Sequence, residues 1–197
     1  MARISYPDPL SLPQKHQDIL NGLPSLNVFR MMAGAGEVFP PFMDFINAYL
    51  NNVLIEAQLR ELIILRIGNI SGSTYEVHQH ERVARTEGLS DDRIAATRKP
   101  SPSAVYSDAE NAALRMAEEI VANVRPSDAT FQDAQTHFSD GQLQELTIIA
   151  GFYMMVSRYL ETFDIELEEE EIEGSGLAEI RQVTETSDRN QVTKNSQ

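Results

Sequence analysis

Residues 59–90 read LRELIILRIGNISGSTYEVHQHERVARTEGLS, and this stretch decides the fold. Its first part belongs to residues 56–71, where apolar side chains cover most of a helix circumference. A helix that is apolar on nearly every side has to be buried. The sequence therefore predicts a central buried helix over residues 56–71, which ends at the turn Ser71-Gly72-Ser73.

A second helix is predicted directly after that turn, over residues 74–87. Ser73 suits its N-cap, where a side-chain oxygen accepts a hydrogen bond from the first-turn amides, and Glu76 stands three residues later at the capping-box position. Gly88 suits the left-handed residue that ends a helix. The two predicted helices thus follow one another across a tight turn.

Further helices are predicted on both sides of this pair from apolar spacing and capping residues. They cover residues 12–23, 28–35, 39–54, 91–97, 109–123, 128–137 and 142–163. The sequence contains no sustained strand alternation, so the predicted fold class is all-α. The expected domains are an N-terminal arm with short helices (1–38), one helical domain (39–167) and an acidic, polar, largely disordered tail (168–197).

Two segments of the chain echo one another. Residues 58–64 and 142–148 both read Gln-Leu-x-Glu-Leu-x-Ile, and each begins a long apolar helix. One interpretation is a duplicated helical unit, which gives the fold two related halves. The other interpretation is coincidence between two amphipathic helices.

Composition narrows the classes of function. The chain of 197 residues has a net charge of −14 and no cysteine. Nucleic acids and anionic membranes attract basic proteins, so neither is an expected partner. Disulfides, thiolate nucleophiles and cysteine-ligated metals are excluded. The N-terminal residues lack the apolar core of a signal peptide, and no apolar run approaches the roughly 18 residues of a transmembrane helix, so a cytoplasmic protein is expected.

Glu61 is the first candidate for chemistry, because a carboxylate on a nearly apolar helix is unusual. Unpaired burial of a carboxylate is unfavourable, so such groups are paired, protonated or functional. Arg60 or the helix dipole could stabilise Glu61. The alternative is a partly exposed glutamate at the start of a helix.

Glu76 and His80 are the second candidate. They stand four residues apart on one face of the predicted helix, whereas His78 points elsewhere. A nearby carboxylate raises the pKa of a histidine, so the pair suits proton transfer. An ordinary surface pair is one alternative. A metal site with Glu61 as third ligand is another, but no His-Glu-x-x-His pattern is present and no metal is predicted.

The stretch 59–90 resembles the core of the carboxymuconolactone decarboxylase/AhpD-like family. That core has a Glu on one helix, a Cys-x-x-Cys-x-x-x-His at the start of the next helix, and then a Gly-Leu-Ser/Thr turn. Residues 151–158, Gly-Phe-Tyr-Met-Met-Val-Ser-Arg, also look like the last core helix of the family. The resemblance covers residues 39–165 and implies an AhpD-like helical bundle.

By this resemblance, Glu61 takes the place of the family's proton-relay Glu, and His80 that of the His that closes the motif. The two cysteine positions fall on Ser73 and Glu76. AhpD-type peroxidase chemistry needs thiolate attack and a disulfide. The chain is therefore expected to belong to a cysteine-free branch and not to be a thiol peroxidase.

What the resemblance then implies is a cofactor-independent lyase of the decarboxylase type, or an isomerase, acting on a small lactone, keto or carboxylic compound. His80 is the expected general acid/base, oriented and tuned by Glu61 and Glu76. The expected substrate-binding residues are Ser73, Arg66, Arg158 and Tyr153. A salt bridge is the alternative role for either arginine, and a plain N-cap for the serine.

Family members assemble into trimers and other rings, so the resemblance implies a homo-oligomer (dimer, trimer or hexamer) beside the small-molecule substrate. No cofactor is expected. The competing hypothesis is a non-catalytic or small-molecule-binding helical oligomer of the same fold. In that case Glu61, Glu76 and His80 form a satisfied polar cluster with no cavity beside it, whereas the lyase or isomerase predicts a closed pocket that contains these three residues.

Overall fold

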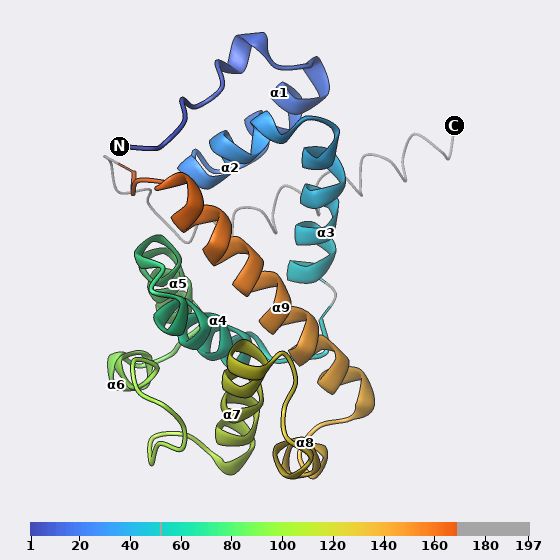
Figure 1. Cartoon of the computed structure of the whole chain (residues 1–197), viewed down its shortest axis with the longest axis vertical. Coiled ribbons are helices and arrows are strands. Elements are labelled where there is room, and N and C mark those ends of the chain that lie inside the picture. Colours follow the sequence, from blue (N-terminus) through green and yellow to red (C-terminus); the bar gives the residue numbers. More distant parts are fainter. Residues whose placement is uncertain (52, 169–197) are drawn as a thin grey trace. The chain divides into compact units, whose positions relative to one another are not determined.

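The computed structural model describes residues 1–51 and 53–168, and within them every regular element is a helix (Figure 1). The predicted all-α class is confirmed. The α-helices are α1 (Gln14–Asn21), α2 (Asn27–Met32), α3 (Phe39–Asn51), α4 (Ala57–Ser71), α5 (Thr74–Thr86), α6 (Asp91–Ala96), α7 (Asp108–Asn123), α8 (Asp128–Gln135) and α9 (Asp140–Phe163). The 3₁₀ helices are η1 (Pro9–Ser11) and η2 (Ala33–Val38).

The predicted helices over residues 56–71 and 74–87 are confirmed as α4 and α5. The helix predicted over residues 28–35 is wrong in its last residues. There the chain passes from α2 into η2, where Gly36 has a φ of 63°. Glycine adopts this left-handed conformation readily because it has no Cβ, and an α-helix cannot continue through it.

The chain divides into two compact units, Met1–Val53 with Phe163–Gln197, and Leu54–Thr162. In the first unit, hydrogen bonds join the N-terminal arm to the last residue of α9 and to a residue that follows it. The Arg3 amide donates to the Phe163 carbonyl over 2.9 Å, and the Ala2 amide donates to Oε1 of Glu166 over 2.9 Å. The domain limits expected from the sequence stay a prediction, and the tail expected from residue 168 onward lies beyond Glu168 outside the described residues.

Helix α4 is the centre of the second unit. All side chains from residue 59 to residue 68 are buried, as the apolar sequence predicts. Helices α5 and α7 pack along α4, α8 packs on α7, and α6 contacts α5. Each large aliphatic side chain buried in this way contributes about 1.5–3 kcal/mol, so α4 stabilises the unit more than any surface contact does.

Two sets of hydrogen bonds fix the directions of α5 and α9 relative to α4. Glu145, near the start of α9, accepts from the amide of Leu54 over 2.8 Å and from that of Ile55 over 3.0 Å, just before α4. Gln58, at the start of α4, donates to the carbonyl of Glu87, just after α5, over 2.9 Å. The start of α9 and the end of α5 thus lie at the same end of α4. Helices α5 and α9 therefore run in opposite directions (Figure 1).

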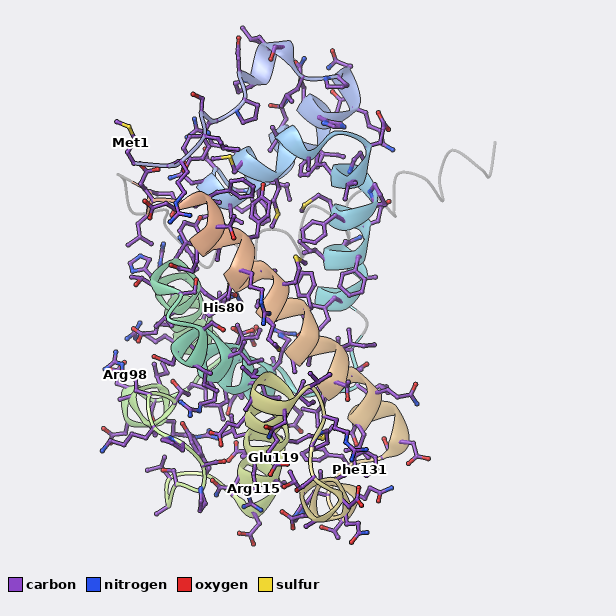
Figure 2. All side chains as sticks on the ribbon, in the orientation of Figure 1. Met1, His80, Arg98, Arg115, Glu119 and Phe131 are labelled. Carbon is purple, nitrogen blue, oxygen red and sulfur yellow. The ribbon has the colours of Figure 1, made fainter. Side chains whose placement is uncertain are left out.

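Charged pairs surround this core at the surface. Arg98 pairs with Glu81 over 2.9 Å, and Arg115 pairs with Asp133 over 3.1 Å. Figure 2 labels the two arginines. Exposed pairs of this kind contribute about 0–1 kcal/mol each. Among the described helices, none combines the length and the apolar character that crossing a membrane requires.

Candidate active site

Glu61 lies on the buried central helix α4 and is fully enclosed, with 0 % of its surface exposed. Its Oε1 lies 3.0 Å from Nε of Arg60, and its Oε2 lies 2.7 Å from Nδ1 of His80. The alternative of a partly exposed glutamate is therefore wrong. Burial of this carboxylate is compensated by two cationic partners.

Helix α5 brings Glu76 and His80 to the same place. Gly72 ends α4 with a φ of 69°, and the chain turns back into α5. Nε2 of His80 lies 3.3 Å from Oε1 of Glu76, and both side chains are buried. The alternative of an ordinary surface pair is wrong, because the pair faces α4 rather than solvent. His78 is exposed, as its spacing predicts.

Gly68 permits the close approach of the two helices. A Cβ at this position would lie 3.1 Å from Cγ2 of Val77 and 3.2 Å from Cγ of Glu76. These distances are shorter than ordinary carbon–carbon contacts. Gly68 therefore determines how near Glu76 sits to α4.

Arg60, Glu61, His80 and Glu76 form one chain of contacts, which we call the buried cluster. Burial disfavours the charge on Glu61, but the positive charge and hydrogen bond of His80, followed by Arg60, keep the pKa of this carboxyl below its usual range. Burial likewise disfavours the imidazolium of His80, but Glu61 and then Glu76 raise its pKa to about 9. At neutral pH, Glu61 is thus ionised and His80 is protonated.

Glu76 behaves differently from Glu61. Burial raises the pKa of the Glu76 carboxyl, and the negative charge of Glu61 raises it further, against the effect of His80. The two carboxyl groups on either side of the imidazolium thus have pKa values shifted in opposite directions, that of Glu61 downward and that of Glu76 upward. Such a difference separates a proton-holding group from a charge-stabilising group. The His80–Glu76 pair is the part of the buried cluster that can store and release a proton.

Ser73 occupies the N-cap position of α5, but its hydroxyl makes no capping hydrogen bond. The predicted capping box with Glu76 is wrong, because the Glu76 side chain contacts His80 instead. The chain places a capping box on α7, where Ser107 and Glu110 exchange the two hydrogen bonds.

Of the remaining predicted residues, Tyr153 joins the buried cluster and the two arginines have other contacts. The rings of Tyr153 and His80 meet edge to face, with centroids 5.1 Å apart. Nε of Arg66 lies 2.7 Å from Oε1 of Glu118, so the salt-bridge alternative is confirmed for this arginine. Arg158 is exposed and donates to a carbonyl of its own helix, that of Met154, over 3.0 Å.

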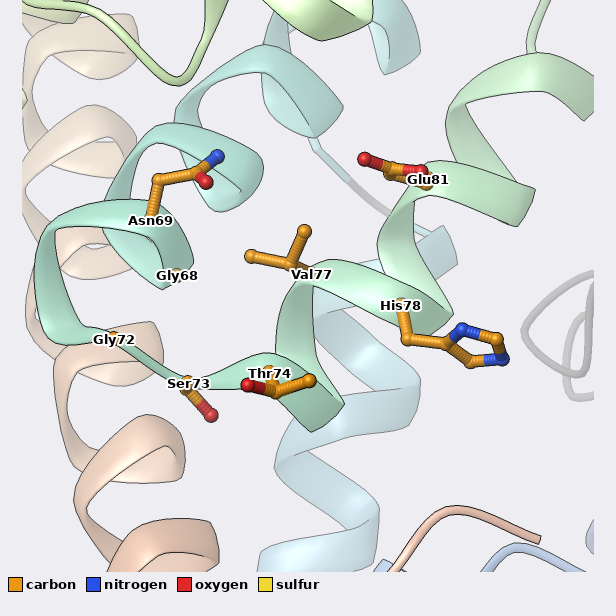
Figure 3. Close-up of a pocket in the computed structure, with 8 residues that line it drawn as sticks. All are labelled: Gly68, Asn69, Gly72, Ser73, Thr74, Val77, His78 and Glu81. Carbon is orange, nitrogen blue, oxygen red and sulfur yellow. The ribbon is translucent and has the colours of Figure 1, made fainter.

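An open pocket of about 330 Å³ lies at the α4–α5 turn (Figure 3). Its lining residues are Gly68, Asn69, Gly72, Ser73, Thr74, Val77, His78 and Glu81. In Figure 3 the Ser73 hydroxyl points away from Asn69 and Glu81. Glu61, Glu76 and His80 are not among the residues that line this pocket.

Two features of the site were missed from the sequence. Oε1 of Glu87 lies 3.7 Å from Nη2 of Arg60, which adds a second carboxylate to the arginine. Gly68 sets the distance between α4 and α5. The signal for Gly68 was present, since a glycine inside an apolar helix costs about 1 kcal/mol and indicates close packing.

Among the described residues, no group of three or more His, Asp or Glu side chains is arranged to hold a metal ion.

Part of the chain is similar to a known protein family. Residues 40–119 match the model of the carboxymuconolactone decarboxylase family, and this range includes Glu61, Glu76 and His80. The resemblance predicted from residues 59–90 is confirmed by this match, and the chain has no cysteine.

Solved structures with an AhpD-like fold resemble this chain. The AhpD-core, peroxidase-related protein of Ralstonia eutropha JMP134 has a TM-score of 0.73 and 18% identity, over 91% of this chain and 96% of that one. A protein of unknown function from Agrobacterium tumefaciens has a TM-score of 0.62 and 27% identity, over 70% and 96%. The first likeness shows the fold alone.

In sequence, the chain is also similar to the uncharacterized protein YdfG of Bacillus subtilis (strain 168). The two are 27% identical over 103 residues, which are 51% of this chain and 70% of YdfG. The shared fold hosts several proteins without an established activity, so function has to be argued from the residues of the site.

Proposed function

We propose that this protein is a cofactor-independent lyase or isomerase, of the carboxymuconolactone decarboxylase type, that uses acid/base chemistry on a small lactone, keto or carboxylic compound. One observation carries the proposal. An imidazole lies between two buried carboxylates, 2.7 Å from Glu61 and 3.3 Å from Glu76. Proton transfer by positioned groups of this kind accelerates reactions by about 10²–10⁴-fold.

Each member of the buried cluster then has a distinct role. Glu61, itself held by Arg60, orients the imidazole of His80 and stabilises its positive charge. Both ring nitrogens of His80 are engaged, so Glu76 stands at the far end of the chain of contacts. The proton held by the His80–Glu76 pair is the one that reaches the substrate.

The proposed lyase step balances without a cofactor. The bond between the substrate carboxylate and its neighbouring carbon breaks, carbon dioxide leaves, and the electron pair passes into the enolate of an adjacent carbonyl. The His80–Glu76 pair gives its proton to the enolate carbon and regains a proton from water. In an isomerisation, the same pair removes a proton from one carbon and returns it to another. Burial of the pair keeps bulk water from competing in this transfer.

Replacement of His80 tests this proposal. We expect His80→Ala to abolish turnover in a panel of small lactones, keto acids and carboxylactones, followed by loss of substrate and release of carbon dioxide. The matched control is His78→Ala, which removes an exposed histidine from the same helix and should leave turnover unchanged. Circular dichroism checks that both variants fold. Unchanged turnover in folded His80→Ala would contradict the assignment.

A second candidate function is a non-catalytic or small-molecule-binding helical oligomer. The observation that favours it is that Glu61, Glu76 and His80 all have partners within the protein, so the buried cluster is satisfied without a ligand. Under this alternative the wild type turns over no member of the panel, while His80→Ala still lowers the melting temperature.

We also propose that the protein assembles as a homo-oligomer. Support comes from an open groove of about 510 Å³ on the second unit, lined in part by Phe131, Leu143 and Ile148. Exposed apolar surface of this kind is typical of interfaces. Light scattering should give the mass of a dimer, trimer or hexamer, and Ile148→Asp should lower it. Val124→Asp, at an exposed position that does not line the groove, is the control.

A further inference from the structure

Two buried hydroxyl groups of the second unit have no hydrogen-bond partner within the described part of the chain. They are Oγ of Ser73 and Oγ of Ser157, and each residue is 1 % exposed. A buried hydroxyl without a partner is unfavourable, so such groups are rare and call for an explanation. Other serines of this chain satisfy theirs locally, as Ser107 and Ser127 do by capping α7 and α8.

Ser73 lies on the same face of α5 as the acid/base residues. Positions 73, 76 and 80 are separated by three and four residues, which is the spacing of neighbours along one helix face. In Figure 3 the Ser73 hydroxyl also points away from Asn69 and Glu81, two other residues that line the pocket. Ser73 therefore extends the row formed by Glu76 and His80.

Helix geometry places Ser157, on α9, at about the level of Glu76. Tyr153 contacts the ring of His80, and Ser157 follows Tyr153 by four residues on the same face of α9. Four residues advance a helix by about 6 Å. Because α5 and α9 run in opposite directions, this step along α9 matches the step from His80 back to Glu76 along α5. The two hydroxyls are thus brought to the Glu76 end of the buried cluster.

We propose that Ser73 and Ser157 form the subsite that binds the carbonyl oxygen of the substrate, beside Glu76. Both hydroxyls donate to this oxygen, which supplies the partner that each lacks within the protein. The ligand class is a small lactone or ketone, which has a strong acceptor and needs no cationic residue. This choice of ligand class rests on the proposed function, whereas the position of the subsite rests on the two hydroxyls.

A matched pair of ring compounds tests the subsite. γ-Butyrolactone carries a ring carbonyl, and tetrahydrofuran is the corresponding ring ether without it. In amide NMR titrations, γ-butyrolactone should shift the signals of residues around Ser73 and Ser157, and tetrahydrofuran should bind at least tenfold more weakly. Ser73→Ala and Ser157→Ala should each weaken lactone binding by about tenfold, as expected for the loss of one hydrogen bond to a ligand.

Thermal unfolding separates this subsite from a structural role. Neither variant should melt below the wild type, because the removed hydroxyl has no protein partner, whereas Ser107→Ala should melt lower because it loses a helix cap. The proposal is overturned if the wild type does not bind γ-butyrolactone, if it binds both rings equally, or if both variants bind normally. It is also overturned if Ser73→Ala and Ser157→Ala both melt as low as Ser107→Ala.

The same measurements distinguish this proposal from the proposed function. If lactone binding depends on the two serines but no panel compound is turned over, the subsite proposal is supported and the acid/base activity is contradicted. If turnover requires His80 but is unchanged in both serine variants, the acid/base activity is supported and the subsite proposal is contradicted.

Discussion

His80 makes the stability of the protein depend on pH in a defined direction. In the folded chain its pKa is about 9, compared with an ordinary value of 6.5. The folded state thus binds this proton more tightly than the unfolded state does, and the resulting stabilisation is complete below pH 6.5 and lost as the pH rises through about 9. We expect the melting temperature to fall between pH 7 and about 9.5, and to fall less in His80→Gln. Equal slopes in the two proteins would contradict the raised pKa.

Glu61→Gln removes the carboxylate that holds His80 and Arg60. Loss of one partner from a buried ion pair leaves an uncompensated charge and typically costs about 3 kcal/mol or more, so this variant should unfold at clearly lower denaturant concentration. The pKa of His80, followed by NMR, should fall as well. Glu56→Gln is the control, because Glu56 is exposed at the start of the same helix and its replacement should change stability by less than about 0.5 kcal/mol.

Some residues of the site could be predicted from the sequence, and others could not. Glu61, Glu76 and His80 were predicted as one group because the family resemblance fixed their order on two consecutive helices. Spacing alone did not separate a buried pair from a surface pair, since i and i+4 neighbours occur on any helix face. Ser157 gave no signal, because its significance depends on which residues of α9 face α5, and that is a property of packing.

Helix packing gives a prediction at Gly68. A Cβ added there would lie 3.1 Å from Val77 and 3.2 Å from Glu76, so Gly68→Ala should force α4 and α5 apart and destabilise the protein by about 1–3 kcal/mol. Gly151→Ala is the matched control, because an added Cβ meets no atom within 4 Å on α9. Removing the flexible glycine there should stabilise the protein by about 0.5–1 kcal/mol. Chemical denaturation of both variants measures the difference, and equal effects would contradict a close approach at Gly68.

The order and type of the helices followed from the sequence more fully than their ends did. Helices α4 and α5 were predicted well because an all-round apolar segment and a glycine turn specify them locally. The segment at residues 28–38 was harder, since the residues there favour a helix until Gly36 takes a positive φ. Ser73 looked like a capping residue by type, but its neighbour Glu76 is engaged by His80, which only the folded structure shows.

For the chain as a whole, the absence of cysteine carries a prediction about peroxides. A thiol peroxidase needs a thiolate and a disulfide, and this chain supplies neither. Purified protein should not accelerate the consumption of hydrogen peroxide by dithiothreitol. Peroxide reduction that persists after rigorous purification would contradict this exclusion and call for a different chemistry.

The all-helical class and the family resemblance could be predicted from the sequence, because periodicity and a long motif specify them. The division into two compact units was not, since it depends on which segments pack together after folding. The two similar segments, residues 58–64 and 142–148, use their glutamates differently. Glu61 of residues 58–64 accepts a hydrogen bond from a histidine, whereas Glu145 of residues 142–148 accepts from the backbone amides that lead into α4.

The contact between Glu61 and His80, at 2.7 Å and shut off from solvent, has a practical consequence. Hydrogen bonds between charged groups at such separations are short and strong, and a proton held in one gives a resonance far downfield of the amide signals. That resonance would act as a built-in reporter. Compounds that bind beside Glu76 would change the chemical shift of this resonance, which allows ligands to be screened before any reaction has been identified.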